Sequence, residues 1–159
     1  MGSGHFRMDL SVVRQGLRLF WEFGLQPLEE MVRVAELLEH SVYERGSLVR
    51  RGSRIEFVLL NPPLRMGAFS SIAARLDDVP VAPEAAFISP GGTGASRAFS
   101  TITRDDPLTI PVGVRTRISL EAPQVEPGHR RVRLELHSRA IPPRVWFEFS
   151  DHLGPDPSP

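Results

Sequence analysis

The sequence of 159 residues contains no cysteine and no lysine, so all 19 of its basic residues are arginine. Without cysteine the chain has no disulfide, no thiolate nucleophile and no cysteine metal ligand. Without lysine, a Schiff base, a lysine general base and the lysine of a P-loop are excluded as well. These two absences remove several classes of enzyme before any motif is considered.

Net charge is also absent, because 19 arginines balance 19 aspartates and glutamates. A neutral chain lacks the basic excess that binds nucleic acids and the polybasic cluster of a membrane-surface protein. No apolar run approaches the length of about 18 residues that spans a bilayer, and the first ten residues do not resemble a signal peptide. We therefore expect a cytoplasmic protein with no nucleic-acid and no membrane partner.

Proline and apolar spacing divide the chain near Gly46. Before Gly46 the apolar residues have helical spacing, and after it they alternate between prolines and glycines. The sequence therefore predicts an α+β fold, in which two N-terminal helices within residues 9–46 precede an antiparallel β-sandwich over residues 47–153. Residues 1–8 are expected to be a disordered tail or a tag, and residues 154–159 a second disordered tail.

Two features define the predicted helices. Residues 27–46 place apolar side chains on one face, with Pro27 suited to the first helical position and Gly46 to the end. An earlier helix over residues 10–23 is apolar around much of its girth, so it needs cover on more than one side, for which a second subunit is the expected source. The residues expected in that interface are Leu10, Val13, Leu17, Phe20, Trp21 and Phe23.

Clean alternation predicts strands over residues 114–121, 131–137 and 144–150, each with one buried and one wet face. A turn over residues 138–143 would pair the last two strands. The expected register places Arg133, Glu135 and His137 opposite Glu148, Trp146 and Arg144, respectively. Pro80 follows a predicted turn at Asp77-Asp78 and belongs on an edge strand.

The wet faces of these strands carry arginines beside a tryptophan, an arrangement that can clamp carboxylates or stack on sugars. The candidate ligand-binding residues are Arg115, Arg117, Arg131, Arg133, Glu135, Trp146 and Glu148. The alternatives for this face are a protein interface and a solvated set of cross-strand ion pairs.

Other motifs indicate turns rather than chemistry. In "SPGGTGASR", residues 89–97, the glycine spacing does not fit a dinucleotide loop, and no amphipathic helix follows, so we expect a hairpin or crossover loop and no nucleotide. Asp77-Asp78 and Asp105-Asp106 could act as acid–base pairs, but they are interpreted as turn formers. No G-x-S-x-G motif occurs, and we assign no catalytic residue and no cofactor.

The histidines leave one metal hypothesis open. They form no i, i+4 helical pair, yet His129, His137 and His152 could converge with Asp151 in space. Surface histidines without a metal are the alternative.

The stretches "FVLLNPPLRMGAFSSI", "RLDDVPVAPE" and "ISLEAPQVEPGHRRVRLELHS" resemble, in their order, the small β-subunit of bacterial C-glycoside deglycosidases. The resemblance covers residues 55–138 and leaves out the predicted helices. It implies a non-catalytic sandwich subunit that packs against a barrel-type catalytic partner, and it assigns no catalytic residue to this chain.

Three functions follow from these patterns. The first is a non-catalytic accessory or assembly subunit, which associates with itself or with a catalytic partner through the helices and a sheet face. The second is a small-molecule or carbohydrate binder that uses the Arg/Trp face. The third is a metal-dependent hydrolase built on the histidines.

Overall fold

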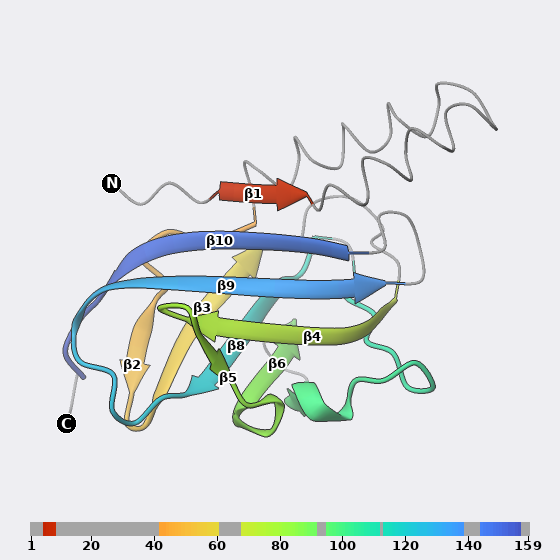
Figure 1. Cartoon of the computed structure of the whole chain (residues 1–159), viewed down its shortest axis with the longest axis horizontal. Coiled ribbons are helices and arrows are strands. Elements are labelled where there is room, and N and C mark those ends of the chain that lie inside the picture. Colours follow the sequence, from red (N-terminus) through yellow and green to blue (C-terminus); the bar gives the residue numbers. More distant parts are fainter. Residues whose placement is uncertain are drawn as a thin grey trace.

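The chain forms two antiparallel β-sheets packed face to face (Figure 1). This computed structural model describes residues 5–8, 42–60, 68–91, 95–111, 113–138 and 144–156. In order across the first sheet, here called sheet I, the strands are β1 (His5–Met8), β10 (Arg144–Leu153), β9 (Gly128–Ser138), β4 (Phe69–Leu76) and β5 (Val79–Val81). In sheet II they are β2 (Val49–Arg51), β3 (Arg54–Leu60), β8 (Arg115–Glu121), β6 (Ala86–Pro90) and β7 (Arg97–Ala98). Two single 3-10 turns, η1 (Pro83–Ala85) and η2 (Phe99–Thr101), flank β6 and β7.

The predicted α+β class is wrong for the part of the chain that the structure describes, which contains strands and 3-10 turns but no α-helix. The second predicted helix reaches described residues only at 42–46, and there Tyr43 forms a β-bridge with Leu59. Backbone hydrogen bonds from Leu60 N to Val42 O (2.9 Å) and from Glu44 N to Val58 O (3.1 Å) attach this segment to β3. These bonds to a neighbouring strand replace the helical ones that the local pattern predicted.

The rest of the helical prediction falls on residues 9–41, which lie outside the described residues. The same holds for all six residues of the predicted helical interface, Leu10, Val13, Leu17, Phe20, Trp21 and Phe23.

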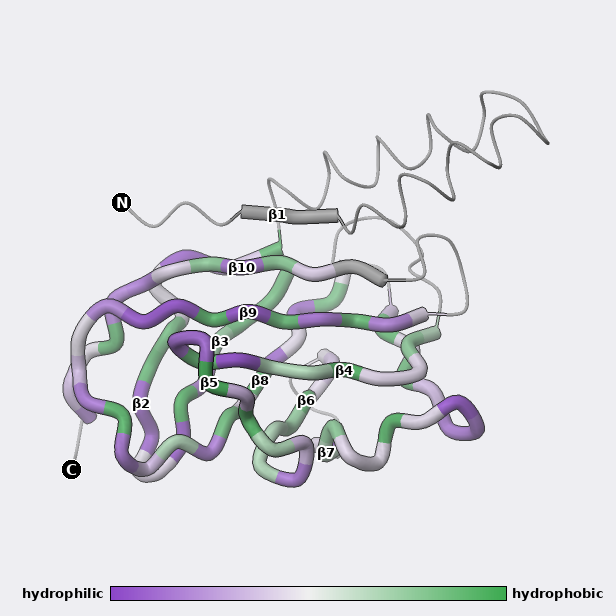
Figure 2. Tube along the Cα trace, in the orientation of Figure 1, coloured by the Kyte–Doolittle hydropathy of each residue, from purple (hydrophilic) through white to green (hydrophobic). Residues whose placement is uncertain are grey.

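The core lies between the two sheets and is built from the inward rows of the strands. In β9, Val132 and Leu134 are buried, while in β8 Ile118 and Leu120 are buried from the opposite side. Figure 2 shows the resulting alternation of hydrophilic and hydrophobic residues along β9. The predicted inward and outward rows of these strands are confirmed, because one face of each strand must meet the other sheet.

The tight turn between β4 and β5 is also confirmed. Asp77 and Asp78 have φ angles of 49° and 68°, and Leu76 pairs with Val79 across them. Two successive left-handed residues make the two-residue turn that matches the twist of a hairpin, and aspartate tolerates that conformation. Pro80 lies in β5 at the end of sheet I, so its predicted place on an edge strand is correct as well.

The glycine-rich stretch connects two paired strands. Phe87 of β6 pairs with Ala98 of β7, and the two strands are antiparallel. Gly91 has a φ of 76°, which a glycine adopts without strain. Residues 92–94 lie outside the described residues. The flanking strands pair as a hairpin, which is one of the two alternatives predicted for this stretch.

Both ends of the chain contribute to the sandwich. Within the segment expected to be a disordered tail or tag, β1 pairs with β10 through contacts such as Phe6 with Phe147. Near the other end, Asp156 Oδ2 accepts a hydrogen bond from Gly52 N (3.0 Å).

Candidate functional site

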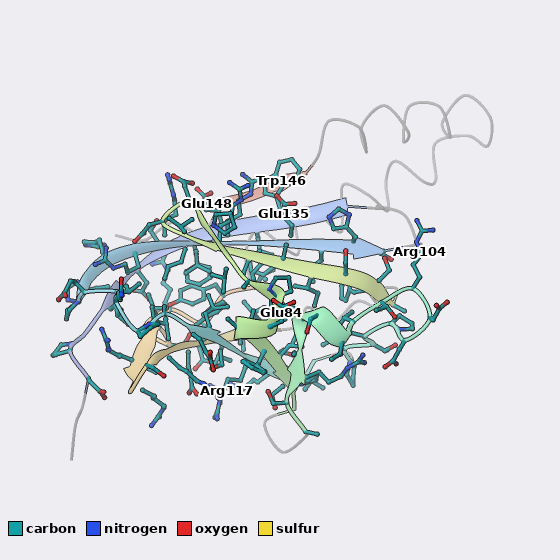
Figure 3. The ribbon with its side chains drawn as sticks, turned by 60° about the horizontal axis from the view of Figure 1, so that its bottom comes forward. Glu84, Arg104, Arg117, Glu135, Trp146 and Glu148 are labelled. Carbon is teal, nitrogen blue, oxygen red and sulfur yellow. The ribbon has the colours of Figure 1, made fainter. Side chains whose placement is uncertain are left out.

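The seven residues predicted to share one ligand-binding face lie in two different sheets. Arg115 and Arg117 belong to β8 of sheet II, whereas the other five belong to β9 and β10 of sheet I. All seven point outward, so the two groups occupy opposite sides of the sandwich, as the separation of Arg117 from Trp146 in Figure 3 shows. The prediction of a single face is therefore corrected. The five residues in sheet I are Arg131, Arg133, Glu135, Trp146 and Glu148.

The outer face of sheet II carries exposed ion pairs. Arg115 binds Glu44 through two nitrogens, with Nε–Oε2 at 2.9 Å and Nη2–Oε1 at 2.6 Å. Arg54 binds Glu121 at 3.1 Å. Arg117 is exposed and forms no hydrogen bond or ion pair within the part of the chain that the structure describes. This face matches the solvated alternative, whose pairs contribute little to stability.

The register predicted for the last two strands is confirmed in sheet I. Trp146 lies opposite Glu135, and Glu148 lies opposite Arg133. On the other side of β9, Arg75 of β4 also lies opposite Arg133. We call the following outward residues of sheet I the Trp146 face: Ala73 and Arg75 of β4, Arg133, Glu135 and His137 of β9, and Trp146 and Glu148 of β10.

Arg133 is held in place by two neighbours on the Trp146 face. Its guanidinium carbon lies 5.0 Å from the centroid of the Trp146 ring, within the range of a cation–π contact. Its Nη2 lies 3.2 Å from Glu135 Oε1. The second oxygen of Glu135 lies 3.9 Å from His137 Nε2. Glu135 therefore sits between two potential cations, and the Arg133 side chain has little freedom left.

Part of the Arg133 guanidinium is removed from water. Its Nε is buried and has no hydrogen-bond partner among the described residues, although the side chain as a whole is 31% exposed. The Glu135 side chain is only 19% exposed. Removal of water strengthens the electrostatic contacts that these charged groups make. It also costs free energy wherever a buried polar atom is left without a partner.

Arg131 differs from Arg133, because Arg131 is already hydrogen-bonded to the two aspartates of the turn before β5. Asp78 Oδ2 accepts a hydrogen bond from Arg131 Nη2, and Asp77 Oδ1 accepts one from Arg131 N (2.9 Å). Asp77 Oδ2 also lies 3.2 Å from Arg130 Nη1. The pair Asp77-Asp78 thus binds neighbouring backbone and arginines, which confirms its interpretation as a turn former.

The second acidic pair has the same role. Asp106 O accepts a hydrogen bond from Thr103 N, and Asp106 N donates one to Thr103 Oγ1, both at 3.1 Å. Asp106 also binds Arg97 at 3.0 Å. Asp106 therefore stabilises a turn, as the sequence predicted for this pair.

The structure brings two of the three candidate histidines together. His129 and His152 face each other across β9 and β10, with ring centroids 5.6 Å apart. His137 lies at the other end of β9, opposite Arg144. Among the described residues, no group of three histidine, aspartate or glutamate side chains is placed to hold a metal ion.

Asp151 takes part in a contact that the sequence did not reveal. Its Oδ2 accepts hydrogen bonds from Tyr43 Oη (2.5 Å) and Gly46 N (2.8 Å), and its Oδ1 accepts one from His152 N (2.7 Å). Partial burial would raise the pKa of Asp151, but these bonds, together with the nearby His129, outweigh it and lower the pKa below its ordinary value of 3.8.

Tyr43 is the other half of this contact. Burial, together with the hydrogen bond to the Asp151 carboxylate, raises the pKa of Tyr43 above its ordinary value of 10.0. The phenol therefore stays protonated at neutral pH, which makes it a donor rather than a base. No local pattern reveals this pair, because Tyr43 and Asp151 are 108 residues apart in the sequence. The local spacing around Tyr43 predicts a helix instead.

No protein-family model matches this chain, and no curated protein sequence matches it either. The resemblance to the small β-subunit of C-glycoside deglycosidases therefore stays a prediction. Within the described ranges, no helix has the length and hydrophobicity needed to span a bilayer.

Proposed function

We propose that this protein is a non-catalytic assembly module that binds a partner protein through the Trp146 face. Tryptophan and arginine are the residue types that carry most of the binding energy of protein interfaces. Here Trp146 and Arg133 lie together on adjacent strands of a sheet, a rigid support for a binding surface.

The observation that carries this proposal is the fixed position of Arg133. Its stacking on Trp146 and its ion pair with Glu135 order the side chain before any partner arrives. Ordering a long side chain on binding costs about 0.5–1.5 kcal/mol, and a side chain that is already ordered avoids most of that cost. A surface whose side chains are already ordered therefore loses less entropy when a partner binds.

The carbohydrate alternative has less support from this geometry. A sugar stacks on the face of an aromatic ring, and the Arg133 guanidinium already lies over the Trp146 ring. The hydrolase alternative requires a metal, and the described histidines and carboxylates do not gather into a site for one. The implied role of an accessory sandwich subunit, from the resemblance above, agrees with assembly.

Quantitative affinity purification from the cells of origin tests the proposal. The tagged wild-type chain should recover a protein partner in near-stoichiometric amount. An untagged copy of this chain counts as such a partner. Trp146→Ala and Arg133→Ala should lose that partner, whereas Arg117→Ala, which removes an exposed outward arginine from sheet II, should keep it. Equal recovery with all four proteins would refute the proposal.

A further inference from the structure

The outward rows that flank β9 differ in both charge and size. On the β4 side lie Ala73 and Arg75, and on the β10 side lie Trp146 and Glu148. The register makes these rows correspond: Ala73 and Trp146 both pair with Glu135, and Arg75 and Glu148 both pair with Arg133. A small residue on one side thus matches a large one on the other, and a cation matches an anion.

Arg75 is the unbalanced charge in this arrangement. It lies directly opposite Arg133, and like charges opposite each other in a sheet are destabilising. Arg133 is paired with Glu135, whereas Arg75 is exposed and forms no hydrogen bond or ion pair among the described residues. Within the described ranges, no carboxylate balances the charge of Arg75. A carboxylate from a bound molecule can fill that role.

We propose that the molecule bound at the Trp146 face is a second copy of this chain, related by a two-fold axis that lies along β9. This inference rests on the proposed function and names its partner. Such an axis places the β4 row of each copy over the β10 row of the other. Arg75 then meets the partner's Glu148, and Trp146 packs on the partner's Ala73. Each contact occurs twice, as a two-fold interface requires.

Because β9 lies on the axis, Arg133 of one copy lies near Arg133 of the other, and two bare positive charges would repel. Arg133 is neutralised by Glu135 at 3.2 Å, so each copy brings an ion pair rather than a bare charge to the axis.

Charge exchange at Arg75 and Glu148 tests this arrangement by sedimentation velocity of the purified chain. Arg75→Glu and Glu148→Arg should each weaken self-association at least about tenfold, because each places like charges against each other twice. The double variant Arg75→Glu/Glu148→Arg should return to within about threefold of wild type. An equimolar mixture of the two single variants should form mixed dimers, since both contacts of the mixed dimer are then between opposite charges: one is the native pair of Arg75 with Glu148 and the other is the same pair reversed.

The control is Arg117→Glu, which makes the same change of charge on the outer face of sheet II and should leave self-association unchanged. A monomeric wild-type chain would overturn the two-fold inference. So would single variants that dimerise like wild type, or a double variant no better than the singles.

These failures are distinguishable from a failure of the proposed function. If the wild-type chain is a monomer but Trp146→Ala still loses a different protein in affinity purification, the Trp146 face binds another partner, and only the two-fold inference is wrong. If neither a copy nor another protein depends on Trp146, both are wrong.

Discussion

Tyr43 and Asp151 are 108 residues apart in the sequence and are joined by a hydrogen bond of 2.5 Å. Tyr43 is attached to β3 of sheet II, and Asp151 belongs to β10 of sheet I, so the bond ties the two sheets together. The Tyr43 ring also stacks on Phe149, with centroids 3.7 Å apart and planes 10° from parallel. One residue thus supplies both polar and aromatic contacts between the sheets.

Removing only the hydroxyl should separate these two contributions. Tyr43→Phe keeps the ring against Phe149 but leaves the Asp151 carboxylate without its shortest hydrogen bond. We expect a loss of about 1.5–3 kcal/mol in the free energy of unfolding, the usual value of a hydrogen bond to a charged group. Urea denaturation measures the loss. A variant as stable as wild type would show that the bond contributes nothing.

The lowered pKa of Asp151 makes part of the stability depend on pH. Because this carboxyl releases its proton more readily in the folded state, its contribution is present above its unfolded pKa and is lost as the pH falls through its folded pKa. The stability difference between wild type and Asp151→Asn should therefore be large at neutral pH and shrink in strong acid. Urea midpoints of both proteins across this range measure it, and a difference that stays constant with pH would contradict the assignment.

At the left-handed position of Asp78, alanine should destabilise the protein more than glycine does. Asp78 has a φ of 68°, and an alanine in that region costs roughly 1–2 kcal/mol. Asp78→Gly and Asp78→Ala both remove the contact with Arg131, so the difference between them isolates the backbone effect. We expect a lower urea midpoint for the alanine variant. Equal midpoints would mean that the turn relaxes without cost.

Truncating a side chain to alanine should destabilise the protein far more at the centre of the core than on the outer face of sheet II. Phe57 is fully buried and lies 5.1 Å from Phe149 between ring centroids, so Phe57→Ala should cost about 3–5 kcal/mol. Phe87 is partly exposed beneath Arg54, and Phe87→Ala should cost only about 1 kcal/mol. Thermal unfolding of the two variants ranks them, and a reversed order would place the core elsewhere.

Local sequence patterns predicted much of this sandwich. The alternation of β8 and β9, the turn at Asp77-Asp78, the edge position of Pro80 and the pairing of Glu135 with Trp146 all depend on residues close in sequence. Ser119 marks a limit even there: it occupies an outward position yet is only 8% exposed, because it lies between Glu56 and Phe87.

Features set by distant residues were not predictable in this way. Alternation tells which side of a strand is wet but not which sheet the strand joins, so Arg117 was grouped with Trp146. Likewise, Val42 continued the helical spacing of the residues before it, but its backbone pairs with Leu60 and its neighbour Tyr43 contacts Phe149 and Asp151. Contacts of this range override local propensity.

Site-specific photo-crosslinking most directly tests whether the Trp146 face is the surface on which this protein assembles. A benzophenone amino acid at position 73, opposite Glu135 and across β9 from Trp146, should form a covalent adduct with a partner chain in solution or in cells. The same group at position 117, on the outer face of sheet II, should not. Adducts at position 117 alone, or none at position 73, would contradict the account.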